Sequence, residues 1–223
     1  KLGTENGFEV DTTTNSSLIE EKNLKQYAAV IWLNTTGDVL DNRQEADFER
    51  YIQSGGGYVG IHAAADTEYE WGWYNRLVGG YFSDHPGIRD PHPNVQQGLI
   101  QVTDRKHPTC GFLPETWERT DEWYSYKKFN DQVNVLMDLD ESSYQGGLDM
   151  GFHPIAWYHD YDGGRAFYTG GGHTSASWQE ALFLRHVLEG IRYAIGKNKK
   201  PDFSKVKTHP VPEANRFEKK MLV

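Results

Sequence analysis

Apolar residues in the first third of the chain come in short runs separated by polar or glycine-rich segments. Residues 28–33 form a nearly continuous apolar run, and residues 58–61 form a second one after three glycines. Runs of this kind are typical of strands buried on both faces, as in a parallel sheet covered by helices. Between them, residues 41–53 have apolar positions at helical spacing behind a capping Asp41. The order strand, helix, strand predicts an α/β fold.

Polar and apolar residues alternate more regularly in the middle of the chain, which indicates antiparallel or edge strands. The strands expected there cover residues 99–102, 115–119, 122–127 and 133–139. The pattern also predicts a strand at 8–11, a short helix at 71–78 and a loop from 81 to 94.

Asp162-Gly163-Gly164 is a hairpin signal between apolar segments 153–158 and 165–169. Three glycines then open a helix predicted for 175–195, whose apolar residues repeat with helical spacing. We therefore expect one mainly parallel sheet with two helices packed against it. Its members are strands 28–33, 58–61 and 165–169 and helices 41–53 and 175–195.

The apolar run 58–61 ends at His62, which three alanines follow. A strand followed at once by a turn of small residues has the geometry of a nucleophile elbow, which projects one side chain at the carboxyl edge of a sheet. Elbows that carry out acyl transfer have Ser or Cys at this position, so His62 predicts different chemistry. The alternative is a strand end capped by a hydrogen-bonded histidine.

His173 is a second candidate because it follows glycines 170–172 at a predicted strand-to-helix junction. Free amides at a helix start favour an anionic group. Parallel strands end at the same edge of a sheet, so we expect His62 and His173 to form one site. Such a pair can act as acid and base, or as two ligands of a divalent metal such as zinc that a carboxylate completes. The alternative for His173 is a helix N-cap.

Several other polar residues are candidates for the same site. Asp66 and Glu70 lie one turn past the elbow and can supply a carboxylate. Asp121 and Glu122 are adjacent, so in a strand they face opposite sides and cannot pair with each other as glycosidase carboxylates. His153 begins a strand and is either a third imidazole of the site or a strand-edge residue.

Four aromatic residues, Trp71, Trp73, Trp123 and Tyr124, lie near acidic residues in the sequence. Exposed aromatic faces beside carboxylates suit a sugar ring, which has C–H faces and hydroxyl edges. The alternative is that these side chains pack in the core or under loops.

The chain of 223 residues suits one α/β domain, over residues 1–196, followed by a strap or linker at 197–223. Its net charge of −9 gives no electrostatic support to a nucleic-acid partner. No apolar run is long enough to predict a membrane span. A single cysteine, Cys110, excludes an internal disulfide framework.

Several of these segments resemble, in order, the trehalose-utilisation (ThuA-like) domain family. The matching segments are 59–69, 73–74, 77–79, 119–124, 153–157, 163–169 and 172–174. The resemblance implies a flavodoxin-like, class I glutamine amidotransferase-like fold with a mainly parallel sheet and helices on both faces. In that superfamily the elbow carries Cys and a later strand end carries His. His62 and His173 stand at these positions and Cys110 lies elsewhere, so no amidotransferase activity is expected.

The family opens with a strand and a Gly-Phe-Arg-His type loop, and neither occurs in this sequence, so the first strand is expected to be missing from it. The stretch 197–223 resembles the linker that leads to a sugar-dehydrogenase domain in some relatives. The resemblance thus implies a fused sugar-dehydrogenase domain or a homo-oligomer, and a periplasmic or extracellular location.

Together these observations predict a carbohydrate-processing domain that acts on a sugar or keto-glycoside, as in trehalose-type disaccharide metabolism. The predicted catalytic residues are His62, His173 and Asp66, and the two histidines are also the candidate metal ligands. The predicted substrate-binding residues are Trp71, Trp73, Glu70, Trp123, Tyr124 and His153. The competing interpretation is a non-catalytic carbohydrate-binding or scaffolding module.

Overall fold

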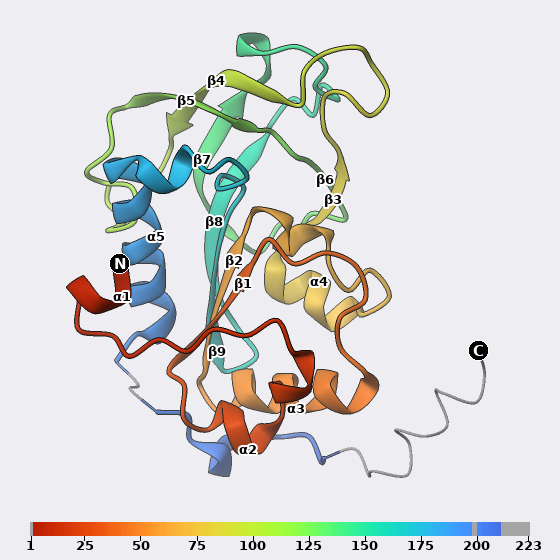
Figure 1. Cartoon of the computed structure of the whole chain (residues 1–223), viewed down its shortest axis with the longest axis vertical. Helices are drawn as coiled ribbons and strands as arrows, with labels where there is room; N and C mark the ends of the chain where they lie inside the picture. The colour runs from red at the N-terminus through yellow and green to blue at the C-terminus, as the bar shows by residue number, and fades with distance from the viewer. Residues whose placement is uncertain (1, 198–199, 211–223) are drawn as a thin grey trace.

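A curled seven-stranded sheet with helices on both faces forms the body of the molecule (Figure 1). The computed structural model describes residues 2–197 and 200–210. The strands, in their order across the sheet, are β1 (Ala29–Leu33), β2 (Gly57–Ile61), β9 (Gly164–Thr169), β8 (Pro154–Tyr161), β7 (Asn134–Asp140), β4 (Val95–Val102) and β5 (Thr116–Glu122). A second sheet pairs β3 (Tyr81–Asp84) with β6 (Ser125–Lys127).

The α-helices are α1 (Leu2–Glu5), α2 (Glu21–Leu24), α3 (Asn42–Gln53), α4 (Gly72–Val78) and α5 (Ala181–Ile195). Short 3-10 turns are η1 (Ser16–Leu18), η2 (His62–Asp66), η3 (Glu141–Ser143), η4 (Ser177–Gln179) and η5 (Phe203–Lys205). The predicted helix at 41–53 is confirmed as α3. Its Asp41 cap accepts the backbone N–H groups of Arg43 and Gln44, and the Gln44 side chain reciprocates in a capping box.

The three apolar strands of the expected sheet lie side by side and run parallel, as predicted. β2 pairs with β1 on one side and with β9 on the other. Ile61 at the end of β2 is in register with Leu33 and Thr169, the last residues of its two neighbours. The segments that follow these strands therefore leave the sheet at one common edge.

The expected mainly parallel, flavodoxin-like arrangement is not confirmed, because β8, β7, β4 and β5 continue the sheet in antiparallel pairings. The β8–β9 hairpin turns at Asp162 and Gly163, whose φ angles of 44° and 97° give the left-handed conformation that a tight two-residue turn requires. A two-residue connection of this kind can join only antiparallel strands. The more regular alternation of these strands had indicated this difference.

The antiparallel half of the sheet curls back so that its last strand faces β2. Four antiparallel steps separate β9 from β5, so β5 runs in the same direction as β9 and ends at the same edge. A flat sheet would place β5 five strand spacings, about 24 Å, from β2. Yet Glu122 at the end of β5 contacts His62, the residue after β2.

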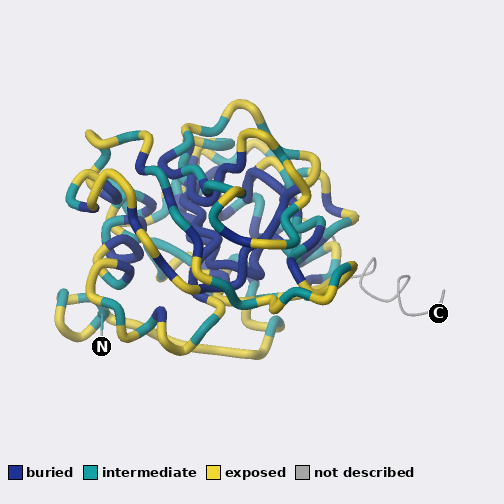
Figure 2. Tube along the Cα trace, turned by 90° about the horizontal axis from the view of Figure 1, so that it is seen from above, coloured by how far each residue is buried: buried dark blue, intermediate teal, exposed yellow. Residues whose placement is uncertain are grey.

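Helices cover both faces of the parallel part of the sheet. α5 packs along β9, where the absence of a side chain at Gly190 lets the Phe167 ring approach the helix backbone. On the other face Trp32 packs against Phe48 of α3 and Tyr74 of α4, with ring centroids 5.4 and 4.9 Å away. The buried residues follow these central strands, and the exposed ones follow the surrounding loops (Figure 2).

Several predicted elements differ from the structure. The strand predicted at 122–127 is divided, because residue 122 ends β5 and only residues 125–127 form β6, in the second sheet. Residues 8–11 form no strand, since none of the described strands pairs with them. Residues 81–84, predicted as loop, form β3 because Tyr81 and Phe82 pair with β6. The helix predicted for 175–195 begins only at Ala181, after residues 172–177 are held in turns by contacts with β5.

The strand β1 is also less buried than its sequence suggested. It lies at the edge of the sheet, and its Ile31 and Leu33 side chains remain exposed. These residues share a face with Val59 and Ile61 of β2, on the side where α5 packs over β9 and β2. The helix layer does not extend over Ile31 and Leu33, so the prediction that this strand is buried on both faces is wrong.

The described part of the stretch 197–223 lies against the end of α3. The Asp202 amide donates to the Ser54 carbonyl at 2.7 Å, and the Lys207 amide donates to the Gln53 side chain at 2.9 Å. The remainder of this predicted strap or linker, at 198–199 and 211–223, falls outside the described residues. Among the described helices, none is long and apolar enough to cross a membrane.

Candidate functional site

The turn after β2 places His62 in an uncommon backbone conformation. Its φ of 46° lies in the left-handed region, which non-glycine residues rarely adopt and which is enriched at functional sites. The Tyr168 hydroxyl donates to the His62 carbonyl at 2.8 Å, and the three alanines that follow are buried against the core. The elbow predicted from the small residues is thus present, with the histidine at its tip.

The surroundings of the His62 ring determine which nitrogen carries a proton. Nδ1 lies 2.7 Å from the Gly170 carbonyl oxygen, which can only accept, so Nδ1 donates. In the neutral ring Nε2 is then a lone-pair acceptor, and it lies 3.0 Å from Oε2 of Glu122. The ring is hydrogen-bonded, as the capping alternative supposed, but its second nitrogen faces an acidic side chain.

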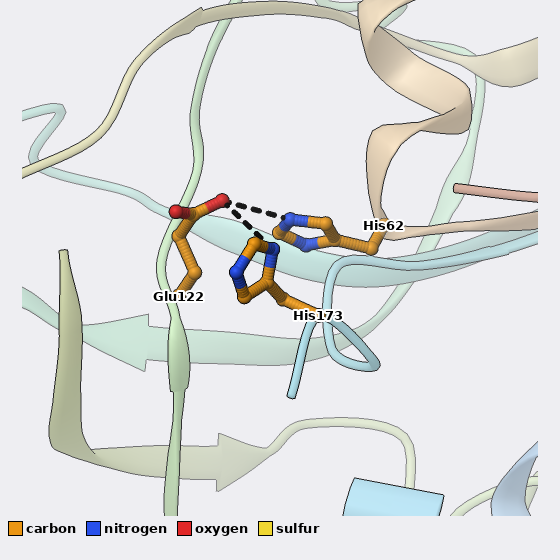
Figure 3. A group of neighbouring side chains, drawn as sticks. All are labelled: His62, Glu122 and His173. Carbon is orange, nitrogen blue, oxygen red and sulfur yellow. Dashed lines mark hydrogen bonds and ion pairs between the residues drawn. The ribbon is translucent and has the colours of Figure 1, made fainter. Parts of the chain in front are cut away.

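His62, Glu122 and His173 converge on one point at the carboxyl edge of the sheet (Figure 3). Nδ1 of His173 lies 3.2 Å from the same Oε2 that His62 contacts. The ligand atoms of all three side chains lie within 4.8 Å of one another. His62 and Glu122 are buried, whereas the His173 side chain is 40% exposed, so the group opens to solvent at His173. We call these three residues the histidine–glutamate cluster.

The donor atoms of this cluster suit a divalent metal ion. Two imidazole nitrogens and one carboxylate oxygen are a common ligand set for zinc and for other first-row metals. Metal-binding histidines usually donate their other N–H to a carbonyl or carboxylate, as His62 does to Gly170. Without a cation, the contact between a bare Nε2 and a carboxylate needs an additional proton. The residues therefore fit a metal that takes the place of that proton.

Each oxygen of Glu122 has its own partners. Oε2 faces the two histidines of the cluster, whereas Oε1 accepts from the Asn94 amide at 2.6 Å and lies 3.7 Å from Nε2 of His85. Burial raises the pKa of Glu122, but the hydrogen bond from His62, made when its Nε2 also carries a proton, and the one from the Asn94 amide outweigh burial and hold this pKa below its ordinary value. The carboxylate is thus ionised and oriented.

Sequence reasoning did not identify the partners of this carboxylate. Glu122 was considered only as the neighbour of Asp121, and His85 and Asn94 lay in a predicted loop. The pattern placed Glu122 at the start of a predicted strand, 122–127, whereas it ends β5 in the structure. Its position points to the site only once the direction of β5 and the curl of the sheet are known.

Tyr124 is the predicted substrate-binding residue that lies beside the cluster. Its ring centroid is 4.0 Å from that of His62, and the His85 ring stacks with it at 5.9 Å. His153 lies further back. Its Nε2 contacts the Tyr124 carbonyl at 2.8 Å and its Nδ1 faces Glu141 at 2.7 Å, so it supports the segment that carries Tyr124 and is not a third imidazole of the cluster.

The structure does not bring Asp66 or Glu70 into the cluster. The Asp66 carboxylate accepts from the Tyr69 hydroxyl at the end of η2. Glu70 is exposed beyond it. The carboxylate that joins the two histidines comes instead from Glu122.

The three tryptophans also lie apart from the cluster. Trp71 donates to Glu49 of α3, and Trp73 donates to Asp162 at the β8–β9 turn, on the opposite edge of the sheet. Trp123 is fully buried and donates to the Gln96 carbonyl. These indoles pack α4 and β5 onto the core, because each N–H finds a polar partner there. They therefore do not form an aromatic platform beside His62.

The backbone amides after the glycines are not free, contrary to expectation. Asp121 accepts the N–H groups of Gly172, His173 and Thr174. An anion of the protein itself therefore occupies the place that the sequence suggested for an anionic ligand.

Comparison with known proteins gives the chain a family and a fold. The family model described as "ThuA: Trehalose utilisation" matches residues 1–194. A ThuA-like protein from Bacteroides uniformis is 27% identical, with a TM-score of 0.74, over 91% of this chain and 84% of that one. A ThuA-like protein from Parabacteroides merdae is 21% identical, with a TM-score of 0.68, over 94% of this chain and 90% of that one. A comparison with curated proteins found no match.

Proposed function

This chain belongs to the ThuA family, described as trehalose utilisation, and from that premise we propose that it is a metal-assisted enzyme acting on a sugar or keto-glycoside. The family description supports a role in sugar metabolism. The histidine–glutamate cluster is the proposed active site, with zinc or a similar divalent ion as the proposed cofactor.

One observation carries the proposal: Nε2 of His62, whose Nδ1 is committed to the Gly170 carbonyl, lies 3.0 Å from the Glu122 oxygen that His173 also contacts. The structural His153 also bonds through both nitrogens, but it is a single imidazole on its carboxylate, whereas Oε2 of Glu122 faces two imidazoles. Here two buried side chains and one partly exposed side chain present lone pairs to one point, at the sheet edge where α/β folds bind ligands.

When bound, a divalent ion supplies Lewis-acid polarisation of a substrate oxygen and lowers the pKa of a coordinated water. The residues of the chain would hold and orient it. Gly170 sets the tautomer of His62, and Asn94 fixes Oε1 of Glu122. His173 lies on the solvent side and marks where a substrate would enter. Asn94 and His85 offer polar groups beside Glu122 for substrate hydroxyls.

The test compares the wild type with His62→Gln and Glu122→Gln, and with His209→Gln as a matched control at an exposed histidine. Each protein is freed of metal with a chelator, titrated with zinc or manganese by calorimetry, and assayed for turnover of trehalose and keto-disaccharides. We expect metal binding and metal-dependent turnover in the wild type and control, and loss of both in the two cluster variants.

Turnover that survives both the chelator and the cluster substitutions would refute the metal-assisted site. Sugar binding without turnover in the metal-loaded wild type would instead favour the non-catalytic binding module.

A further inference from the structure

Asp121 is a fully buried carboxylate whose oxygens are occupied by the loop that carries His173. It accepts backbone N–H groups from Gly172 at 2.8 Å, His173 at 3.1 Å and Thr174 at 3.2 Å. The Ser177 hydroxyl donates to it at 2.7 Å. Several donors on one ionised carboxylate make strong, charge-assisted hydrogen bonds.

A buried arginine balances this charge. Nη2 of Arg119 lies 3.4 Å from Oδ2 of Asp121 and donates to the Ser177 hydroxyl at 2.9 Å, while Nε donates to Glu180 at 2.8 Å. The guanidinium also lies 4.4 Å from the centre of the Phe183 ring. Residues 119 and 121 of β5 thereby bind the connection between β9 and α5 at several points between residues 172 and 180.

The backbone of this connection needs such an anion. Gly172 has a φ of 108°, which only glycine adopts readily, and the amides of residues 172–174 all donate to the Asp121 carboxylate. Without this acceptor the Gly172 amide would be a buried donor lacking a partner, which is unfavourable, and the part-buried amides of His173 and Thr174 would lose theirs. The conformation that presents His173 to Glu122 is therefore coupled to the residue before Glu122 on the same strand.

We propose that Asp121 is a positioning residue of the proposed metal site, acting as a resident anion that holds Nδ1 of His173 against Glu122. The proposal rests on the proposed function for its consequence in metal binding. Its structural content, that Asp121 determines where the His173 ring lies, can be measured without metal.

The test uses Asp121→Asn, which replaces one acceptor oxygen of the carboxylate with a donor NH2 group and keeps the size of the side chain. Glu118→Gln is the matched control, because it makes the same chemical change at an exposed position of β5. In the metal-free proteins, NMR follows amide hydrogen exchange at 172–174 and the cross-relaxation between the His62 and His173 rings, whose centroids are 5.0 Å apart.

We expect exchange at these three amides to be at least about tenfold faster in Asp121→Asn, and the contact between the two rings to be lost, with no change in Glu118→Gln. Zinc affinity should fall by about 10–100-fold, as for other residues that orient metal ligands. In a His173→Gln background the same substitution should cost no further affinity, because its effect passes through His173.

Unchanged exchange with an intact contact between the rings would overturn the proposal, as would an equal loss of zinc affinity in the His173→Gln background. If the wild type binds no zinc, the proposed function fails, and the metal-free measurements alone decide the role of Asp121. If Asp121→Asn does not fold, Ser177→Ala replaces it. That variant should speed amide exchange at Gly172 and weaken zinc binding by less than about tenfold. If both the exchange rate and the zinc affinity are unchanged, the proposal is overturned.

Discussion

At the scale of single residues, the candidate site depends on how the two oxygens of Glu122 are divided. Oε2 belongs to the histidine–glutamate cluster, and Oε1 is held by Asn94 at 2.6 Å. Asn94 is exposed, and its side-chain amide donates to the Glu122 oxygen that does not face the cluster histidines. Its amide therefore offers a clean way to change the orientation of the carboxylate while leaving all three candidate ligands in place.

Replacing Asn94 with Leu should weaken zinc binding by about tenfold, in the range found for residues that orient metal ligands. The substitution removes the donor on Oε1, so the carboxylate gains freedom to rotate and the pKa of Glu122 rises towards its ordinary value. Calorimetric titration with zinc measures the effect. Gln132→Leu, also an exposed amide replaced by Leu, is the control, and equal affinities in the two variants would contradict the role of Asn94.

At the scale of elements, a buried carboxylate joins the segment after the elbow to the loop before α3. Glu68 accepts the backbone N–H groups of Val39 and Leu40 at 2.9 and 2.8 Å and interacts with Asp38. Burial, with the neighbouring Asp38 as a smaller contribution, raises the pKa of Glu68 from 4.5 to about 7. Two elements at the edge of the sheet are thus joined by a group that keeps its proton to near neutral pH.

This raised pKa makes stability depend on pH. Between pH 4.5 and about 7 the folded protein holds a proton on Glu68 that the unfolded chain releases, so this contribution to stability falls as the pH rises through that window. Glu68→Gln imitates the protonated side chain and lacks this loss. We expect the difference in unfolding free energy, variant minus wild type, to be more favourable to the variant at pH 8 than at pH 5 by up to about 3 kcal/mol.

Urea unfolding at the two pH values measures the difference, with the exposed Glu70→Gln as control. A constant offset between Glu68→Gln and the wild type at both pH values would show that the Glu68 proton is not linked to folding.

At the scale of the whole molecule, the cluster joins three segments far apart in the chain. His62 follows β2, Glu122 ends β5 and His173 follows β9, and the curl of the sheet brings them together (Figure 3). A ligand that binds all three binds the folded chain and not the unfolded one. Such a ligand must therefore stabilise the fold as a whole.

Zinc should accordingly raise the thermal unfolding midpoint of the wild type. At a free concentration one hundred times the dissociation constant, the stabilisation amounts to about 2.7 kcal/mol. Glu122→Gln should lose the shift, because the oxygen shared by both histidines is then neutral, and a chelator should reverse it in the wild type. Calorimetric melting curves with and without zinc provide the measurement, and an equal shift in Glu122→Gln would place the metal elsewhere.

The sequence alone determined the parallel core and the turn that begins the site. Apolar runs, helical spacing and turn residues identify β1, β2, β9, α3 and the β8–β9 hairpin, because each signal depends on residues close together in the chain. The small residues after His62 identified the elbow for the same reason. The prediction that His62 and His173 approach each other used only the fact that parallel strands end at one edge.

The tertiary structure decided what surrounds that pair. The direction of β5 and the curl of the sheet select Glu122 as the shared carboxylate, and neither can be read from a local pattern. Burial of the Trp71 and Trp73 indoles depends on how α4 packs against α3 and the hairpin. Asp121 accepts the backbone N–H groups at and before His173, and α5 begins only after this loop, at Ala181. Each of these outcomes depends on contacts between distant segments, which side-chain packing and strand order establish only in the folded chain.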